Sequence, residues 1–197
     1  MAAKTIYIFR HGQTDYNAAR RAMGRLDIPL NETGVQQATE LAQKMSGTSI
    51  QAIYSSPLSR ALQTAQIVSE KIGGAPILQN DGLMERNMGK LQGHIVHKTD
   101  NPAEYSTDYN QMELFMPAEQ LNDKNWRPDG GETQVETFRR AQQTIMDIIK
   151  STPYDTIAIS THSGPVRAIL ELTGGGDAWI NNWDYVKLTF DGKILNR

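Results

Sequence analysis

Cysteine is absent from the 197 residues of this chain. Its absence excludes disulfide bonds, zinc–thiolate sites and a cysteine nucleophile together, and it is typical of proteins in a reducing cytoplasm. No apolar run approaches the roughly 20 residues that span a bilayer. Residues 1–4 lead directly into a predicted strand, without an apolar leader. We therefore expect a cytoplasmic protein with no membrane partner.

A strong charge of either sign is also missing, since the formal net charge is only -2. Nucleic acids and acidic membrane surfaces are thus not expected as partners, and any anion site must come from a local cluster of cations. The chain has no internal repeat and no low-complexity linker. Its length suits one domain with a substantial core. We predict a single domain over residues 1–197 and leave its oligomeric state open.

Strand and helix patterns alternate along most of the chain. Residues of β-branched and aromatic type predict strands at 4–9, 50–56, 76–80, 156–161 and 185–190. Apolar residues at helical spacing predict helices between them. We predict an α/β protein, a three-layer α/β/α sandwich with a mostly parallel sheet covered on both faces.

Local signals predict where the helices begin and end. Thr33 and Gln36 have the spacing of a capping box, and Ser56 stands before a proline that would open the next helix. The last helix is expected from about residue 164, with the glycines at 174–176 ending it. The inward face of the helix at 133–150 is predicted from its apolar residues: Val135, Phe138, Ile145, Ile148 and Ile149.

The stretch at about 86–130 is polar and lacks a clear period. We predict mostly loop there, with a short helix or two, forming a lid-like insertion beside a binding site. Ordinary packing is the simpler interpretation for most of its large side chains. The residues that would otherwise shape the mouth of the site are Tyr105, Tyr109, Phe115, Met116, Lys124 and Trp126.

Cationic and histidine side chains follow three of the predicted strands. Arg10 and His11 end the first strand, His162 follows the strand at 156–161, and Arg60 lies in the first turn of a helix. Parallel strands meet at their carboxyl ends, where α/β proteins place their active sites. Arginine forks and a helix N-terminus are the groups that bind phosphate. The sequence therefore predicts a pocket for a phosphate dianion.

A metal site is the competing interpretation. His11 and His162 are possible ligands, with Glu85 or Asp15 supplying a carboxylate. The adjacent arginines argue against it, because they would repel a divalent cation. A second histidine pair, His94 and His97, has no clear carboxylate partner, and we interpret both as surface residues.

Five motifs of this chain resemble blocks of the histidine phosphatase superfamily, which includes cofactor-dependent phosphoglycerate mutases. They are RHGQT at 10–14, YSSPLSRALQTA at 54–65, LMERNMGKLQG at 83–93, PDGGET at 128–133 and STHSGPVRAI at 160–169. The motifs stand in the family's order over roughly residues 6–170. The resemblance implies a phosphoglycerate mutase-like fold and favours the phosphatase-type branch, because the segment after the glutamate is short.

The resemblance also implies a role for each matching residue. His11 would be the nucleophile that accepts the phosphoryl group, and Glu85 the proton donor. Arg10, Arg60 and His162 would hold the phosphate oxygens. Further substrate contacts would come from Asn17, Ser163, Gln13 and Gly24. It implies neither a metal nor a cofactor.

Two residues depart from the family's pattern. Gln13 replaces the usual glutamate, which removes a negative charge beside the pocket but keeps a hydrogen-bonding side chain. Met23 stands where many members carry a small hydroxyl residue or a glutamine, and a thioether cannot donate a hydrogen bond. We expect these changes to tune activity and leave the type of reaction unchanged.

We predict a metal-independent phosphomonoesterase that hydrolyses a small phosphorylated metabolite through a phosphohistidine. A neutral imidazole is a competent nucleophile at neutral pH, and phosphoryl transfer depends mostly on positioning and cationic stabilisation. Two alternatives stay open at this point. One is a cofactor-dependent phosphoglycerate mutase, and the other is a non-catalytic protein that binds a phosphorylated ligand.

Overall fold

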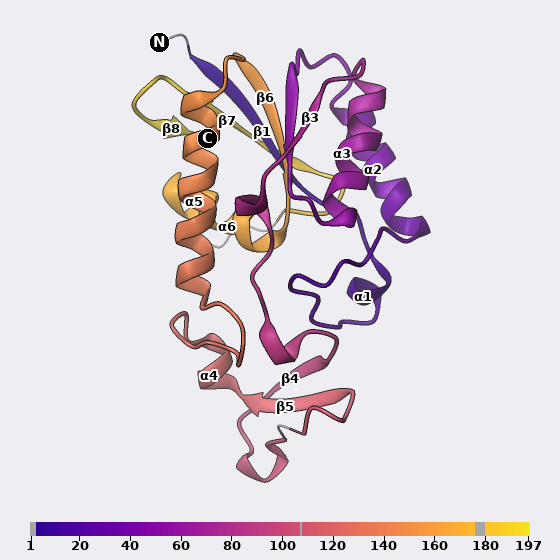
Figure 1. Ribbon diagram of the computed structural model, residues 1–197, viewed down its shortest axis with the longest axis vertical. Coiled ribbons are helices and arrows are strands. Elements are labelled where there is room, and N and C mark those ends of the chain that lie inside the picture. Colours follow the sequence, from indigo (N-terminus) through magenta and orange to yellow (C-terminus); the bar gives the residue numbers. More distant parts are fainter. Residues whose placement is uncertain (1–2, 107, 176–179) are drawn as a thin grey trace.

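The computed structural model describes residues 3–106, 108–175 and 180–197, and a six-stranded sheet forms its centre (Figure 1). The strand order is β3-β2-β6-β1-β7-β8. Strands β1, β2, β3 and β6 run parallel, whereas β7 is antiparallel to β1 and to β8. The strand bounds are β1 Lys4–Arg10, β2 Ala52–Ser55, β3 Ile77–Gln79, β6 Thr156–Thr161, β7 Tyr185–Phe190 and β8 Leu195–Asn196.

Two pairs of helices cover the two faces of this sheet (Figure 1). Side chains of β1 alternate between the faces, as the two-residue period of a strand requires. Tyr7 and Phe9 pack with α2 and α3, and Ile6 and Ile8 pack with α5 and α6. The predicted three-layer α/β/α sandwich is thus confirmed. The helix bounds are α2 Glu32–Lys44, α3 Ser59–Lys71, α5 Gln134–Ser151 and α6 Ser163–Leu172.

The predicted starts of α2 and α3 were wrong. Asn31 caps α2, accepting a hydrogen bond from the Gly34 N–H at 2.9 Å. Leu58 occupies the N-cap of α3, and the Ser59 N–H donates to the Asp27 carboxylate at 2.7 Å. A distant carboxylate therefore takes the role that the local pattern gave to Ser56. At the end of α6, Gly176 of the predicted stop lies outside the described residues.

The segment 86–130 is more ordered than predicted. Strands β4 (Ile95–Thr99) and β5 (Glu113–Pro117) pair in parallel, and α4 (Ala118–Asn122) packs on them. This β4/β5 unit extends from the end of the sandwich (Figure 1) and has a small core of its own, Leu91, Leu114 and Met116. Its strands are short and partly exposed, so their residues do not show the apolar pattern that predicts a strand. Short turns complete the fold: α1 Asp15–Ala18 and the 3₁₀ turns Asp81–Leu83, Gly89–Leu91 and Pro102–Glu104.

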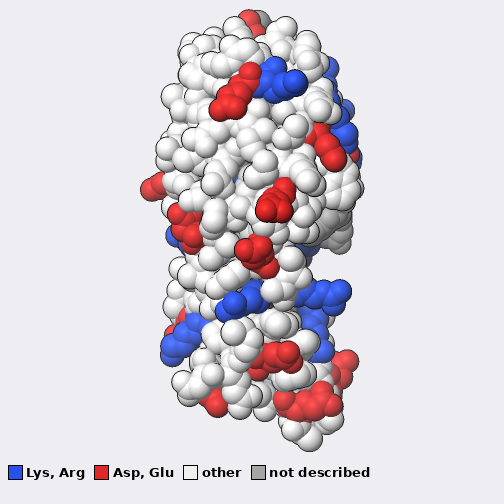
Figure 2. Space-filling model, turned by 90° about the vertical axis from the view of Figure 1, so that its right-hand side faces the viewer, with Lys and Arg blue, Asp and Glu red and all other residues white. Residues whose placement is uncertain are grey.

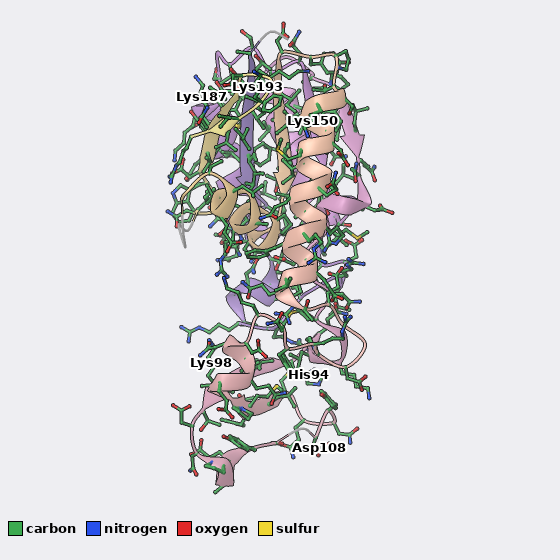
Figure 3. All side chains as sticks on the ribbon, turned by 90° about the vertical axis from the view of Figure 1, so that its left-hand side faces the viewer. His94, Lys98, Asp108, Lys150, Lys187 and Lys193 are labelled. Atoms are coloured by element: carbon green, nitrogen blue, oxygen red, sulfur yellow. The ribbon has the colours of Figure 1, made fainter. Side chains whose placement is uncertain are left out.

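The β4/β5 unit also holds the second histidine pair, which was predicted to lie on the surface. His94 is partly buried, with its Nε2 3.1 Å from the Tyr109 carbonyl oxygen. His97 stacks on Phe115 with 4.7 Å between ring centroids. Figure 3 shows His94 within this unit. Across the described part of the chain, none of the helices is both long enough and apolar enough to cross a membrane.

Candidate active site

The two central histidines meet at the carboxyl edge of the sheet. Arg10 is in register with Thr161 across the parallel pair β1 and β6, so the next residue of each strand, His11 and His162, emerges at the same level. Their ring centroids are 5.1 Å apart. His11 is 2% exposed and His162 is 0% exposed. The predicted meeting of the two histidines at this edge is confirmed, and both side chains are almost completely shielded from bulk solvent.

Arg60 enters this edge from the first turn of α3 and is fully buried. Its two outer nitrogens donate to the carbonyl oxygens of Gly24 and Leu26, each at 2.8 Å. Its buried Nε has no hydrogen-bond partner among the described residues. Burial lowers the pKa of Arg60 to about 10, so the guanidinium stays charged at neutral pH. The loop that carries Gly24 therefore fixes this cation in place.

The hydrogen bonding of His11 identifies its free nitrogen. Nδ1 lies 2.6 Å from the Gly12 carbonyl oxygen, which can only accept. The ring proton therefore belongs on Nδ1, and Nε2 keeps its lone pair. Burial, with Arg60 and Arg10 beside the ring, holds the pKa of His11 well below its usual value. His11 is a neutral imidazole with an available Nε2 at neutral pH.

His162 is held by a serine from the neighbouring strand. Its Nε2 lies 2.8 Å from the Ser56 hydroxyl oxygen, and its buried Nδ1 has no hydrogen-bond partner among the described residues. Burial, together with Arg60, lowers the pKa of His162 well below its usual value. Nδ1 is thus the atom of this side chain that remains for a ligand. The serine that was predicted to cap a helix orients this histidine instead.

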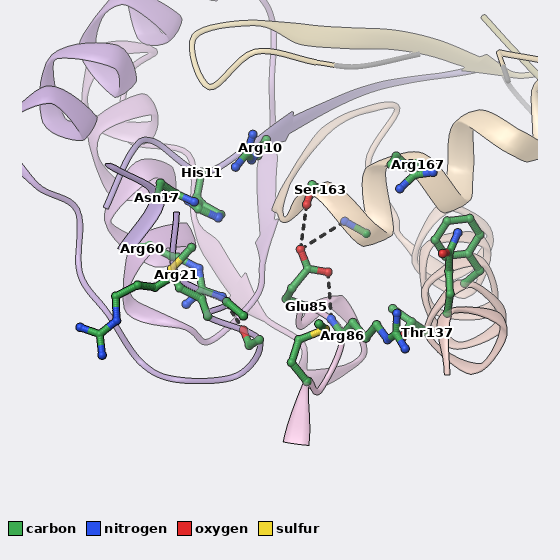
Figure 4. A pocket seen from close by; sticks show the side chains of 17 residues that line it. Arg10, His11, Asn17, Arg21, Arg60, Glu85, Arg86, Thr137, Ser163 and Arg167 are labelled. Carbon is green, nitrogen blue, oxygen red and sulfur yellow. Dashed lines mark hydrogen bonds between the residues drawn. The ribbon is translucent and has the colours of Figure 1, made fainter. Parts of the chain in front are cut away.

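A cavity of about 290 Å³ opens at this edge (Figure 4). Seven of the predicted site residues line it, and Gln13 and His162 do not. We refer to Arg10, His11 and Arg60, with His162 beside them, as the His11 wall. Facing it is the Glu85 wall, formed by Glu85, Arg86, Phe138 and Arg167. The predicted residues among the lining are Arg10, His11, Asn17, Gly24, Arg60, Glu85 and Ser163.

Glu85 is fixed against the N-terminus of α6 (Figure 4). Its Oε2 accepts from the Ser163 hydroxyl at 3.0 Å and from the Gly164 N–H at 3.2 Å, and its Oε1 accepts from the Arg86 N–H at 2.8 Å. A Cβ on Gly164 would lie 2.2 Å from Oε1. Only glycine at this position lets the carboxylate approach so closely.

The loop that carries Glu85 is braced by an ion pair behind it. Arg140 donates to the Glu132 carboxylate at 3.0 Å, and to the carbonyl oxygens of Gly82 and Met84, each at 2.9 Å. Glu132 also accepts from the Asn87 N–H at 2.9 Å. The side chain of Thr133 caps α5, whereas the side chain of Glu132 binds the loop that carries Glu85.

Comparison with known proteins agrees with this geometry. The family model of the histidine phosphatase superfamily (branch 1) matches residues 6–189. This chain belongs to that superfamily.

Its relatives carry both phosphatase and mutase names. Phosphoglycerate mutase-like protein 4 of Arabidopsis thaliana is 32% identical over 84% of this chain and 69% of its own length. A metal-independent phosphoserine phosphatase of the same plant is 30% identical over 97% of this chain and 72% of its own. The solved structure of Bacillus stearothermophilus YhfR has a TM-score of 0.80 and 26% identity, covering 98% of this chain and 94% of that one. The chain is therefore similar to histidine phosphatases over nearly its whole length.

The two residues that depart from the superfamily's pattern have local partners. Gln13 accepts from the Asn31 amide at 3.1 Å, and its backbone N–H donates to Gln37 at 2.8 Å. It thus supports the start of α2 instead of lining the cavity. The Met23 sulfur accepts from the Thr14 hydroxyl at 3.1 Å, while the Asn17 Oδ1 accepts from the Thr14 N–H at 3.1 Å.

The predicted mouth residues mostly lie elsewhere. Of segment 86–130, Arg86 and Met88 line the cavity. Met116 is buried in the core of the β4/β5 unit, whereas Tyr105 and Tyr109 are exposed. Lys124 lines a separate hollow and forms an ion pair with Glu171. None of the six residues lines the cavity, and ordinary packing, the simpler interpretation, holds for Phe115, Met116 and Trp126.

Sequence reasoning also missed residues that face the cavity. Phe138 was predicted to point inward, but it is partly exposed on the cavity wall, with the Arg167 guanidinium carbon 6.0 Å from its ring centroid. Val135 is likewise only partly buried. Helical spacing marks an apolar face but does not tell a core from a cavity. Arg86 had a signal, since it adjoins Glu85, but no role was derived for it.

Proposed function

We propose that this protein is a single-domain phosphomonoesterase that hydrolyses a small phosphorylated metabolite without a metal, through a phosphohistidine on His11. The observation that carries the proposal is the 2.6 Å contact from His11 Nδ1 to the Gly12 carbonyl oxygen. It directs the lone pair of Nε2 away from the backbone, on a ring that burial and two cations keep unprotonated. These are the properties of a nitrogen nucleophile.

In the first step, the Nε2 lone pair forms a bond to phosphorus while the bond from phosphorus to the ester oxygen breaks. Negative charge spreads over the three remaining phosphate oxygens. Arg10 and Arg60 face that charge, and the partnerless Nε of Arg60 and Nδ1 of His162 offer further hydrogen bonds. Such fixed donors stabilise the transition state because they need no reorganisation.

Glu85 completes both half-reactions. The departing alkoxide takes a proton from the carboxylic acid form of Glu85, which leaves a free alcohol and a carboxylate. A water molecule then gives a proton to that carboxylate and attacks phosphorus. The bond to Nε2 breaks, and its electron pair returns to the imidazole. The products are the alcohol and inorganic phosphate, and Glu85 is again protonated.

The decisive experiment measures phosphate release from a panel of phosphomonoesters in the presence of a chelator, for wild type and His11→Ala. We expect activity in the chelator and a loss of at least about 10⁴-fold in the variant. Acid-labile phosphate should label wild type and map to His11. The mechanism is wrong if activity needs an added divalent cation or survives the loss of His11.

A mutase is the second candidate, because relatives of this chain are named as phosphoglycerate mutases. Isomerisation of 3-phosphoglycerate, stimulated by a bisphosphate and faster than phosphate release, would replace the phosphatase proposal with this one. A protein that binds phosphate esters but neither releases phosphate nor isomerises them would instead be a binding protein.

A further inference from the structure

Every polar backbone group of His11 and Gly12 has a hydrogen-bond partner. The His11 N–H donates to the Thr161 carbonyl oxygen at 3.0 Å, and the Gly12 N–H donates to the Thr64 hydroxyl oxygen at 3.1 Å. The Gly12 carbonyl oxygen lies against the Nδ1 of the His11 ring. The His11 carbonyl oxygen accepts from the side-chain amide of Asn182. The place of the ring therefore depends on four contacts around two residues.

The contact from Asn182 differs from the others in its origin. Thr161 and Thr64 are 0% exposed and belong to β6 and α3, which the core fixes. Asn182 is only partly buried, lies 171 residues from His11 in sequence, and belongs to the turn that leads into β7. Its side chain can therefore be replaced without opening a hole in the core.

The antiparallel pairing of β1 and β7 brings Asn182 to this place (Figure 1). Phe9 is opposite Tyr185 in this pair, so the residues before β7 run beside the residues that follow β1. The ring of Tyr185 packs against Tyr7 with 5.3 Å between ring centroids. Before the turn, Ile180 is buried in the core. The turn that carries Asn182 is thus anchored on both sides.

A lysine of α2 also binds this turn. The Lys44 Nζ donates to the Trp183 carbonyl oxygen at 2.9 Å and lies 3.8 Å from the Asp184 carboxylate. Within the turn, the Asp184 N–H donates to the Asn181 carbonyl oxygen at 3.2 Å. The lysine contacts are exposed and contribute little stability, so the buried side chains on either side determine where the turn lies.

The peptide between His11 and Gly12 connects the ring to the carbonyl oxygen that fixes its tautomer. If this peptide turns, the contact from Nδ1 to the Gly12 oxygen lengthens and Nε2 points away from the phosphate. A reacting atom that is misplaced by about 1 Å can cost about 100-fold in rate. A donor that holds this peptide therefore acts on the attack at phosphorus more than on the binding of phosphate.

We propose that Asn182 is a positioning residue for the nucleophile, which holds the peptide after His11 so that Nε2 is aligned with phosphorus. The proposal rests on the proposed function. Attraction of the anionic substrate comes from other groups, and Figure 2 shows Lys and Arg side chains gathered where the β4/β5 unit joins the sandwich. An uncharged substitution at Asn182 leaves these charges as they are.

Replacing Asn182 by leucine removes the amide and keeps a side chain of similar size. With p-nitrophenyl phosphate in a single turnover, release of p-nitrophenol reports the attack on phosphorus. We expect Asn182→Leu to slow this step by about 10-fold or more. Asn182→Gln keeps the donor on a longer stem, for which the partly exposed site has room, and should restore most of the rate. Asn181→Leu makes the same change at the exposed neighbour and should keep the rate of wild type.

Vanadate tests the alignment without turnover. A vanadate ion that bonds to Nε2 becomes five-coordinate and resembles the transition state, whereas inorganic phosphate is held by noncovalent contacts alone. Asn182→Leu should weaken vanadate binding by about 10-fold and phosphate binding by less than about threefold. His11→Ala should remove the preference for vanadate. Phosphate affinity that is retained in Asn182→Leu also shows that this variant is folded.

The proposal is overturned if Asn182→Leu releases p-nitrophenol as fast as wild type, or if it loses affinity for vanadate and phosphate equally. A glutamine variant no better than leucine would also overturn it, because the amide would then not be the group that matters. If wild type releases no phosphate but Asn182→Leu loses the preference for vanadate, the phosphatase proposal fails and the positioning role stands. If phosphate is released and the leucine variant matches wild type, only the positioning role fails.

Discussion

The two walls of the cavity are built in different ways. On the His11 wall, all four residues come from strand ends or a helix start; His11, Arg60 and His162 are at most 2% exposed, and Arg10 is partly buried. On the Glu85 wall, the residues are only partly buried and come from a loop and from helices α5 and α6. The His11 wall takes its geometry from the hydrophobic core, whereas the Glu85 wall depends on a few polar contacts. The core thus fixes the groups that react with phosphate, and the periphery holds those that meet the rest of the substrate.

This difference predicts that the Glu85 wall is more easily broken. Replacing Arg140 by methionine removes the donors to Gly82 and Met84 and one of the two arginines that pair with Glu132, the other being Arg25. We expect the free energy of unfolding to fall by about 3 kcal/mol, as for a broken, mostly buried ion pair. Urea denaturation measures this loss.

Arg139 provides the matched control for Arg140. It is the next residue of α5, carries the same charge and is exposed. Arg139→Met should change the free energy of unfolding by no more than about 0.5 kcal/mol. Equal losses in the two variants would mean that the brace behind the Glu85 loop contributes no particular stability.

A single added methyl group should misplace Glu85 and leave the His11 wall intact. In Gly164→Ala the new Cβ would lie 2.2 Å from Glu85 Oε1, so the carboxylate must move. We expect kcat to fall about 100-fold, which corresponds to about 2.7 kcal/mol in the barrier. Affinity for inorganic phosphate should stay the same, because the phosphate is held by the other wall. A parallel loss of phosphate affinity would show that the walls are not independent.

The same contrast explains how much could be predicted from sequence. His11, His162 and Arg60 were predicted from strand ends, since a buried strand has a clear pattern and parallel register fixes where its end lies. Glu85 was identified only through family resemblance, because its loop has no periodicity. The role of Glu132 was missed, since its partner Arg140 braces a loop that lies 56 and 58 residues from it in sequence at Met84 and Gly82.

Errors in the prediction also follow from contacts that are distant in sequence. Asp27 binds the start of α3 from 32 residues away, so the local serine–proline signal at Ser56 was misleading. Segment 86–130 was predicted as mostly loop, because its two short strands keep one face partly exposed. Helical spacing placed Phe138 on the apolar face of α5, but it could not show that part of this face borders a cavity instead of the core. Each error concerns an element whose partner no local pattern could reveal.

The buried histidines of the His11 wall should make stability depend on pH. Burial and the arginines hold the pKa of His11 and His162 well below their usual value of about 6.5. Below that pH the unfolded chain binds protons that the folded chain does not. Stability is therefore lost as the pH falls from about 6.5 toward the folded pKa values, by about 1.4 kcal/mol per pH unit for each histidine. Urea denaturation between pH 7 and pH 5 measures the slope, and His162→Gln should reduce it by one histidine's share. An unchanged slope in that variant would mean that the folded state tolerates the charge.

The smallest expected effect concerns Ser163, which lies where the two walls meet. Of the three donors to Glu85, the N–H groups of Gly164 and Arg86 can only donate, whereas a hydroxyl can donate or accept. Of the three, Ser163 alone can therefore accept a hydrogen bond from the O–H of the carboxylic acid form as well as donate to the carboxylate. We expect Ser163→Ala to lower kcat by about fivefold, equivalent to about 1 kcal/mol, with KM nearly unchanged. Ser163→Thr keeps the hydroxyl and should restore most of kcat. If threonine is no better than alanine, the hydroxyl is not what matters at this position, and the backbone N–H groups alone position Glu85.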